Sequence, residues 1–169
     1  MGFINQCKQW FDNTPQQTQT IDIYSPVSGE IVSIEQVPDI VFAEKIVGDG
    51  LAITPHGSTI HAPVDGTIGK IFETNHAFSI VTKEGVELFI HFGVGTVELQ
   101  GTGFSRLVEQ GAEVHIGDPI LQFDLNFIQE QVTSTVTPVV IANMDAIQGL
   151  SKKKGSVTAK QDILFSVTI

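Results

Sequence analysis

From Ile21 onward, the chain consists of short runs rich in β-branched residues, separated by glycine and polar turn residues. Apolar and polar positions alternate within many of these runs, as expected for strands with one buried face. Many short strands with close turn signals are typical of an all-β sandwich or barrel. We therefore expect an antiparallel β-sandwich with at most short helices. The best helical candidates are residues 103–110 and 125–131.

Two pairs of segments in this region resemble each other. SPVSGEIVSIE (25–35) is similar to APVDGTIGKIFE (62–73), and a glycine precedes an aspartate by the same step in 111–118 and in 155–162. An ancient duplication of a β-hairpin unit would produce this repetition. A turn chemistry that both segments share would also produce it, because glycine and aspartate are common turn residues.

The first residues follow a different pattern. Their apolar side chains fall on one stripe of a short helix, which consists of Phe3, Ile4, Cys7, Trp10 and Phe11. Residues 13–20 are polar and contain Pro15, as in a flexible linker. We predict that 1–20 form a mobile amphipathic segment and linker, and that 21–169 form a single domain. Through residues 1–12 the segment could make peripheral membrane contact. This contact would be weak, because Lys8 is the only cation that could attract anionic lipid.

The charge of the chain narrows the range of partners. It has 9 Lys+Arg against 19 Asp+Glu, a formal net charge of −10, so it repels phosphate and is not expected to bind nucleic acid. The single cysteine cannot form an internal disulfide, and no apolar run reaches the ~18 residues needed to cross a bilayer. We expect a cytoplasmic monomer whose partners are proteins or small molecules.

The segment HAFSIVTKEGVELFIHFG (76–93) predicts a β-hairpin that carries two histidines. With a turn centred between Lys83 and Glu84, His76 would lie opposite His91, with Cβ atoms about 4.5–5.5 Å apart. A turn at Glu84 and Gly85 would keep both imidazoles on one face as offset neighbours. A three-residue loop would instead move one strand's side chains to the other face.

One face of this hairpin is apolar and is expected to face the core; it consists of Val81, Val86, Leu88 and Ile90. The outward face then consists of His76, Phe78, Phe89 and His91. Phenylalanine side chains left in water do not gain the free energy of burying apolar surface. Their exposure is explained if another protein covers them. Phe42 and Phe72 are expected to extend the same patch.

Paired imidazoles can divide the work of phosphoryl transfer near neutral pH. One acts as the nucleophile through a neutral nitrogen, while the other donates a hydrogen bond to a phosphoryl oxygen. Thr74 could add a hydroxyl on the same face. The pair could instead bind zinc together with further ligands. Alternatively, the two histidines could lie on a solvent-exposed face without a catalytic role. We assign no role to His56 and His115, which are expected to be exposed.

These motifs resemble the glucose-class enzyme IIA proteins of the bacterial phosphoenolpyruvate:sugar phosphotransferase system, in their free-standing enteric form. The resemblance covers about residues 20–160 and includes VPDIVFAEKIVGDGLAI, APVDGTIGKIFETNHAFSI, GVELFIHFG, TVEL and STVTPVVIANMD. It implies an antiparallel β-sandwich of the duplicated hybrid motif type. It also implies that His91 is the phosphorylated histidine, with His76 and Thr74 as its active-site partners.

The resemblance further implies the partners. In this family, Nε2 of the histidine accepts phosphate from the phosphocarrier protein HPr and passes it to a cysteine on the IIB domain of the glucose permease; no cofactor is required. The unphosphorylated enteric form inhibits sugar permeases and glycerol kinase, where the two histidines, here His76 and His91, can join a partner carboxylate around zinc. The phosphorylated form is linked to activation of adenylate cyclase.

The motifs also transfer a partner-binding patch onto this chain, which consists of Asp39, Val41, Phe42, Ile46, Val47, Phe72, Phe78 and Phe89. The family often has an acidic residue two positions after the glycine of HFG, whereas this chain has Gly95. Asp39 is then the nearby candidate for a contact with a cationic HPr.

Two other classes of protein were weighed against this one. A zinc-dependent hydrolase of the lysostaphin-like fold would use the HxxxD spacing of His61 and Asp65, but it also needs a histidine two positions before His91, where this chain has Phe89. A lipoyl or biotinyl carrier would need a lysine in a tight turn, and residues 143–145 contain none.

Overall fold

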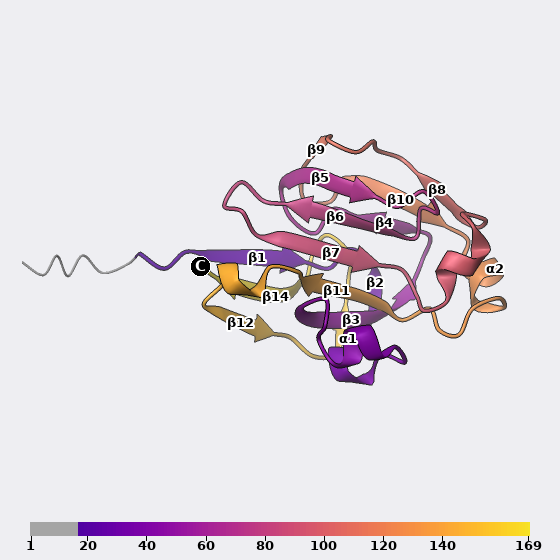
Figure 1. Cartoon of the computed structure of the whole chain (residues 1–169), viewed down its shortest axis with the longest axis horizontal. Helices are drawn as coiled ribbons and strands as arrows, with labels where there is room; N and C mark the ends of the chain where they lie inside the picture. The colour runs from indigo at the N-terminus through magenta and orange to yellow at the C-terminus, as the bar shows by residue number, and fades with distance from the viewer. Residues whose placement is uncertain (1–16) are drawn as a thin grey trace, which may run out of the picture.

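The computed structural model describes residues 17–169 and consists mainly of antiparallel strands (Figure 1). One sheet has eight strands in the order β13-β2-β3-β11-β7-β6-β5-β9, and two smaller sheets have the orders β1-β14-β12 and β4-β10-β8. The prediction of an all-β antiparallel fold with short helices is confirmed. Among residues 17–169, no helix has the length and apolar character needed to cross a membrane.

The strands of the large sheet, in chain order, are β2 (Ser28–Ser33), β3 (Asp49–His56), β5 (Gly66–Ile71), β6 (Ala77–Val81), β7 (Glu87–His91), β9 (Glu113–Val114), β11 (Thr137–Ile141) and β13 (Ser156–Val157). Those of the smaller sheets are β1 (Thr20–Tyr24), β4 (Thr59–His61), β8 (Phe104–Arg106), β10 (Pro119–Phe123), β12 (Gly149–Lys152) and β14 (Ile163–Thr168). The helical segments are η1 (Ile34–Gln36), α1 (Ile40–Ala43), η2 (Thr96–Leu99), α2 (Leu125–Gln129) and η3 (Met144–Ala146).

The repeated segments of the sequence occupy matching places in the large sheet. β2 pairs with β13 near one end of this sheet, and β5 pairs with β9 near the other. The backbone repeats as well, because Ser25 N–H donates to the Asp162 carbonyl and Ala62 N–H donates to the Asp118 carbonyl, both at 2.8 Å. The sequence repetition therefore corresponds to a structural one, as expected for a duplicated hairpin unit.

The helical predictions were partly right. α2 lies within predicted residues 125–131, and the Asp124 carboxylate caps it by accepting from Phe127 N–H at 3.0 Å. The helix predicted over 103–110 was wrong, because this segment forms β8 and pairs with β10. Its Phe104 ring packs on the buried ring of Phe92 at 5.4 Å, so tertiary packing overrides the weak local preference.

The hairpin that carries the histidines has a different register from the one predicted. Thr82 N–H donates to the Val86 carbonyl, which leaves a three-residue loop, 83–85. β6 and β7 therefore pair Ala77 with His91 and Phe78 with Ile90. The three-residue loop changes the parity, so the outward placement of Phe78 was wrong: its side chain is fully buried. The β7 prediction was right, since Leu88 and Ile90 face the core.

Two buried clusters lie on opposite faces of the central strands. The larger contains Phe78, Ile80, Leu88 and Ile90. The smaller lies beneath α1 and consists of Ile34, Val37, Phe42, Ala52, Val94 and Val140, with Phe89 packed against it. Figure 1 shows α1 against β3 and β11. The short helix therefore covers the outer face of the sheet beside β7, which is the strand that ends at His91.

Candidate functional site

His76 and His91 lie next to each other on the outer side of the large sheet. Their ring centroids are 4.7 Å apart and their planes are nearly perpendicular, at 80°. His91 projects from the last position of β7, whereas His76 lies one residue before β6 begins. The neighbouring Asn75 has φ 55°, so a turn interrupts the alternation that would otherwise place His76 on the core side with Phe78.

The backbone also joins the two histidine segments. Phe92 N–H, directly after His91, donates to the carbonyl of His76 at 2.7 Å. Thr74, predicted as the third site residue, lies beside them and contacts His76 through its hydroxyl. The structure therefore brings all three predicted active-site residues together.

The hydrogen bonding of His91 fixes which ring nitrogen is free. Its Nδ1 lies 2.9 Å from the carbonyl oxygen of Gly93. A carbonyl can only accept a hydrogen bond, so Nδ1 carries the proton in this arrangement. In the neutral ring Nε2 then holds the lone pair. A neutral imidazole with a lone pair on Nε2 has the form required of a nucleophile.

His76 is held through the same nitrogen. Its Nδ1 lies 2.6 Å from Thr74 Oγ1, and the side chain is almost completely buried, with 4% exposed. A hydroxyl can both donate and accept. When it donates to Nδ1, the ring proton resides on Nε2, where it can serve a phosphoryl oxygen as a hydrogen-bond donor.

Burial keeps both rings uncharged at neutral pH. Loss of solvent, together with a smaller effect of repulsion from His91, lowers the pKa of His76 to about 4. Burial also lowers the pKa of His91, while its bond to the Gly93 carbonyl and the charge of Asp39 oppose this shift. Lowered pKa values keep the lone pair of His91 Nε2 available at physiological pH.

Three phenylalanine rings surround the imidazoles. Phe42 lies 5.2 Å from the ring of His91, Phe89 lies 6.0 Å from it, and Phe72 lies 5.6 Å from the ring of His76. Phe42 is only 3% exposed, so it supports the site from below instead of forming its surface. This aromatic surround is the apolar environment that lowers both histidine pKa values.

The exposed part of the predicted patch lies on α1 and the turn that follows it. Val41 is 37% and Ile46 is 66% exposed, and Val47 is half-buried. Sequence reasoning missed Ile40 and Val97, which are 63% and 51% exposed. Their signals were present: Ile40 follows a helix-capping aspartate, and Val97 belongs to the TVEL motif.

Asp39 and Gly95 flank this surface. The Asp39 carboxylate accepts from Val41 N–H at 2.9 Å and so begins α1, and its charge acts on His91. Gly95 is exposed and has φ +85° at the start of η2. Asp39 is therefore a carboxylate close to the histidines, whereas the position of Gly95 carries no charge.

The remaining histidines do not join this site. His61 Nδ1–H donates to the carbonyl of Pro26 at 3.2 Å, whereas the Asp65 carboxylate accepts from Ile116 N–H at 2.8 Å and faces His115 at 3.7 Å. His61 and Asp65 thus contact different residues and do not face a common metal site. Across residues 17–169, no group of three His, Cys, Asp or Glu side chains is arranged to hold a metal ion.

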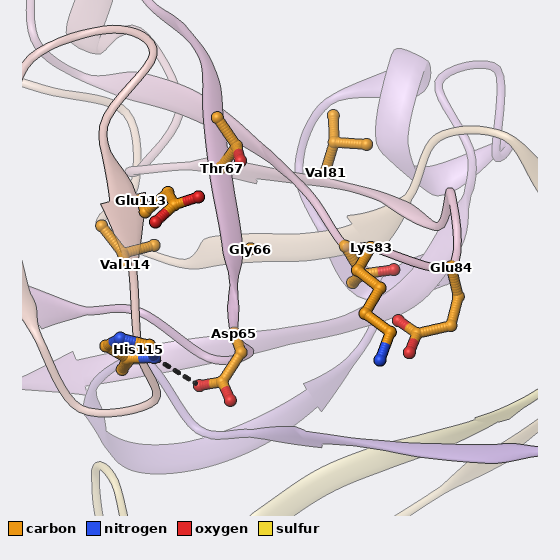
Figure 2. A pocket seen from close by; sticks show the side chains of 10 residues that line it. Asp65, Gly66, Thr67, Val81, Lys83, Glu84, Glu113, Val114 and His115 are labelled. Carbon is orange, nitrogen blue, oxygen red and sulfur yellow. Dashed lines mark ion pairs between the residues drawn. The ribbon is translucent and has the colours of Figure 1, made fainter.

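A cavity of about 500 Å³ (Figure 2) has neither His76 nor His91 in its lining. It is at the far end of the β6–β7 hairpin, beside Val81 and Glu84, and its walls include the carboxylates of Asp65 and Glu113. The lining also contains Lys83 and His115, and His115 faces Asp65 at 3.7 Å. It has no second imidazole beside His115, so it does not reproduce the histidine pair.

The comparisons with known proteins agree with this geometry. Residues 21–147 match the family described as phosphoenolpyruvate-dependent sugar phosphotransferase system, EIIA 1. The chain belongs to this family. An EIIA protein is a phosphotransfer component of the sugar phosphotransferase system, and a pair of neutral imidazoles in an apolar surround agrees with such chemistry.

Individual relatives are similar over most of this EIIA chain. The glucose-specific EIIA component of Haemophilus influenzae is 52% identical over 93% of this chain and 95% of its own length. The N-acetylglucosamine-specific EIICBA component of Escherichia coli is 44% identical over 90% of this chain, which spans 24% of that longer protein. The structure of glucose permease IIA from Mycoplasma capricolum has a TM-score of 0.81 at 35% identity, over 88% of this chain and 96% of its own.

These findings distinguish the phosphocarrier from the zinc-dependent hydrolase, the two functions that the sequence suggested. The family and the relatives named as glucose-specific EIIA components support a phosphocarrier of the sugar phosphotransferase system. They give no support to a zinc-dependent hydrolase, and the divergence of His61 from Asp65 agrees with that.

Proposed function

We propose that this EIIA protein carries a phosphoryl group on Nε2 of His91, accepting it from HPr and passing it to the IIB domain of a glucose permease. The observation that carries the proposal is the hydrogen bond from His91 Nδ1 to the Gly93 carbonyl at 2.9 Å. This bond leaves the Nε2 lone pair as the free nucleophile. The adjacent His76, held by Thr74, is the donor toward the phosphoryl oxygens.

Each transfer exchanges one bond for another. In the first step, the His91 Nε2 lone pair forms a nitrogen–phosphorus bond while the corresponding bond of phospho-HPr breaks and its electron pair returns to the HPr imidazole. In the second, a thiolate of the IIB domain attacks phosphorus and the electron pair returns to Nε2. His76 Nε2–H stabilises the charge on the equatorial oxygens in both steps.

The exposed apolar side chains of α1, of the turn after it and of η2 support docking of successive partners, since Phe42 of α1 lies 5.2 Å from the ring of His91. Ile40, Val41, Ile46 and Val97 are large apolar residues exposed to solvent, and partner burial would exclude water from the reacting groups. The chain's net charge of −10 and Asp39 suit a cationic donor such as HPr. The E. coli relative named EIICBA supports the IIB domain as the next carrier.

We also propose regulatory partners for the same surface. In its unphosphorylated form the protein would bind sugar permeases and glycerol kinase, and in its phosphorylated form it would act on adenylate cyclase. His76 and His91 could supply two of the four ligands of a zinc ion through Nε2, because their Nδ1 atoms are engaged. For His76 this requires the tautomer in which Nδ1–H donates to Thr74 Oγ1. The other ligands would have to come from the partner.

The domain division and location stay predictions. Residues 1–12, proposed to contact membranes weakly, lie outside the described residues. Residues at the predicted boundary join the fold: Gln19 N–H donates to the Ile169 carbonyl at 3.0 Å, and β1 begins at Thr20. We propose that residues 21–169 act as one cytoplasmic, monomeric domain. Proteolysis that leaves this part intact, combined with a monomeric mass in solution, would support this proposal.

The carrier function is tested by incubating the protein with phosphoenolpyruvate, enzyme I and HPr. An acid-labile phosphoprotein should form, and His91→Ala should abolish it. His76→Gln should still accept phosphate but pass it on at least about tenfold more slowly, since it loses the imidazole donor. Labelling that persists in His91→Ala would refute the assignment. The regulatory proposal is tested separately, by capture of permeases with unphosphorylated protein.

A further inference from the structure

One peptide unit connects the nucleophile to a distant part of the chain. The Gly93 carbonyl accepts from His91 Nδ1, and the N–H of the same unit, on Val94, donates to the Ser134 carbonyl at 2.7 Å. Since the peptide is planar, holding its N–H also holds the direction of its carbonyl. The orientation of the His91 ring therefore depends on contacts beyond the histidine pair.

The preceding peptide unit is held by a buried side chain. Thr96 is fully buried, and its hydroxyl donates to the Phe92 carbonyl at 2.7 Å. The N–H of Phe92 donates in turn to the His76 carbonyl at 2.7 Å. Thr96 thus fixes a residue that contacts the segments of both histidines, although its hydroxyl does not bond to either imidazole.

The packing around Gly93 leaves this loop little freedom. Gly93 has φ +69°, and a Cβ added there would lie 2.7 Å from the Ser134 carbonyl oxygen and 2.8 Å from Thr96 Cγ2. The methyl group of Thr96 and the backbone of Ser134 therefore both pack against Gly93 where a Cβ would project. Close packing of this kind restricts the carbonyl to one direction.

We propose that Thr96 is a positioning residue for His91, which holds the 92–94 backbone so that the Gly93 carbonyl keeps the ring in its Nδ1–H form. Ser134 supports the next peptide unit, because its carbonyl accepts from Val94 N–H, and its Oγ accepts from Val136 N–H at 3.1 Å. The effect on the ring follows from geometry alone, whereas its effect on transfer rests on the proposed carrier function.

The test compares Thr96→Val, which keeps the shape and removes the hydroxyl, with Thr96→Ser, which keeps the hydroxyl. Nitrogen-15 NMR of the His91 ring measures the ratio of the two tautomers, and a phosphoryl transfer assay from HPr measures kcat and KM. We expect Thr96→Val to lower the Nδ1–H population measurably and to reduce kcat about tenfold with KM unchanged. Thr96→Ser should restore both values to near wild type.

The outcomes distinguish a role of Thr96 in positioning the His91 ring from a role in protein stability alone. They also distinguish failure of this proposal from failure of the carrier function. A folded Thr96→Val protein with the wild-type tautomer ratio overturns the proposal, as does a Thr96→Ser protein as impaired as Thr96→Val. A changed ratio in a protein that HPr never phosphorylates supports positioning and refutes the carrier function. Should Thr96→Val not fold, Thr96→Ala, which also removes the hydroxyl, must shift the tautomer ratio in the same direction; an unchanged ratio there refutes the proposal.

Discussion

The rings of His76 and His91 lie 4.7 Å apart although the residue paired with His91 across the two strands is Ala77. The small side chain of Ala77 leaves space above the sheet beside His91. His76 enters this space from the turn before β6, where Asn75 has φ 55°. The histidine pair therefore depends on a strand end and not on regular cross-strand pairing, and a short shift of that turn would separate the rings.

The first prediction concerns pH and stability. The pKa of His76 falls from 6.5 to about 4 on folding. Between these two pH values, His76 is mostly protonated in the unfolded chain but mostly neutral in the folded protein. The free energy of unfolding should therefore fall as the pH drops from 6.5 toward 4, by about 3 kcal/mol from this group. Urea unfolding across this range measures it. His76→Gln should lose this part of the slope; an unchanged slope contradicts the prediction.

The second prediction separates two phenylalanines of the hairpin. Phe78 is fully buried in the larger core cluster, whereas Phe89 is half-buried beside His91. Phe78→Ala should lower the free energy of unfolding by about 3–5 kcal/mol because it leaves a cavity. Phe89→Ala should cost clearly less stability but raise the KM for HPr. Equal losses of stability in denaturant unfolding would contradict this division of roles.

The third prediction tests the docking surface. Ile46→Ser should leave stability nearly unchanged, since this side chain is 66% exposed, and should raise the KM for phospho-HPr about tenfold, as expected for a residue important in an interface. Ile116→Ser is the matched control, because Ile116 is also exposed, at 39%, but lies at the far end of the sheet near Asp65. Similar KM values for the two variants would argue against docking at α1.

The fourth prediction compares two glycines with positive φ. Gly85 has φ +88° with no atom within 4 Å of an added Cβ, whereas at Gly93 a Cβ would meet Ser134 and Thr96. Gly85→Ala should cost only the conformational strain, about 1–2 kcal/mol. Gly93→Ala should cost more and should also slow phosphorylation, because the carbonyl that holds His91 must move. Thermal unfolding and the HPr assay measure both; wild-type phosphorylation of Gly93→Ala would contradict the expectation.

The local features of this protein could be predicted from the sequence because they depend on neighbouring residues. Alternation and turn chemistry predicted the short strands, and the segment predicted as helical over 125–131 contains α2. The motifs around His76 and His91 indicated the family and the chemistry of the pair. Phe89 and His91 were correctly placed on the outer face of β7, since β7 is a regular strand.

The sequence alone thus determined the all-β fold, the family and the two imidazoles that we propose for phosphoryl transfer. Only the tertiary structure decided that Phe78 belongs to the core, because the loop of residues 83–85 sets the parity of the hairpin. It also decided which nitrogen of His91 is free, since the Gly93 carbonyl is directed by contacts with Ser134, which is distant in the chain. Register and carbonyl direction are fixed by long-range packing, which no local pattern encodes.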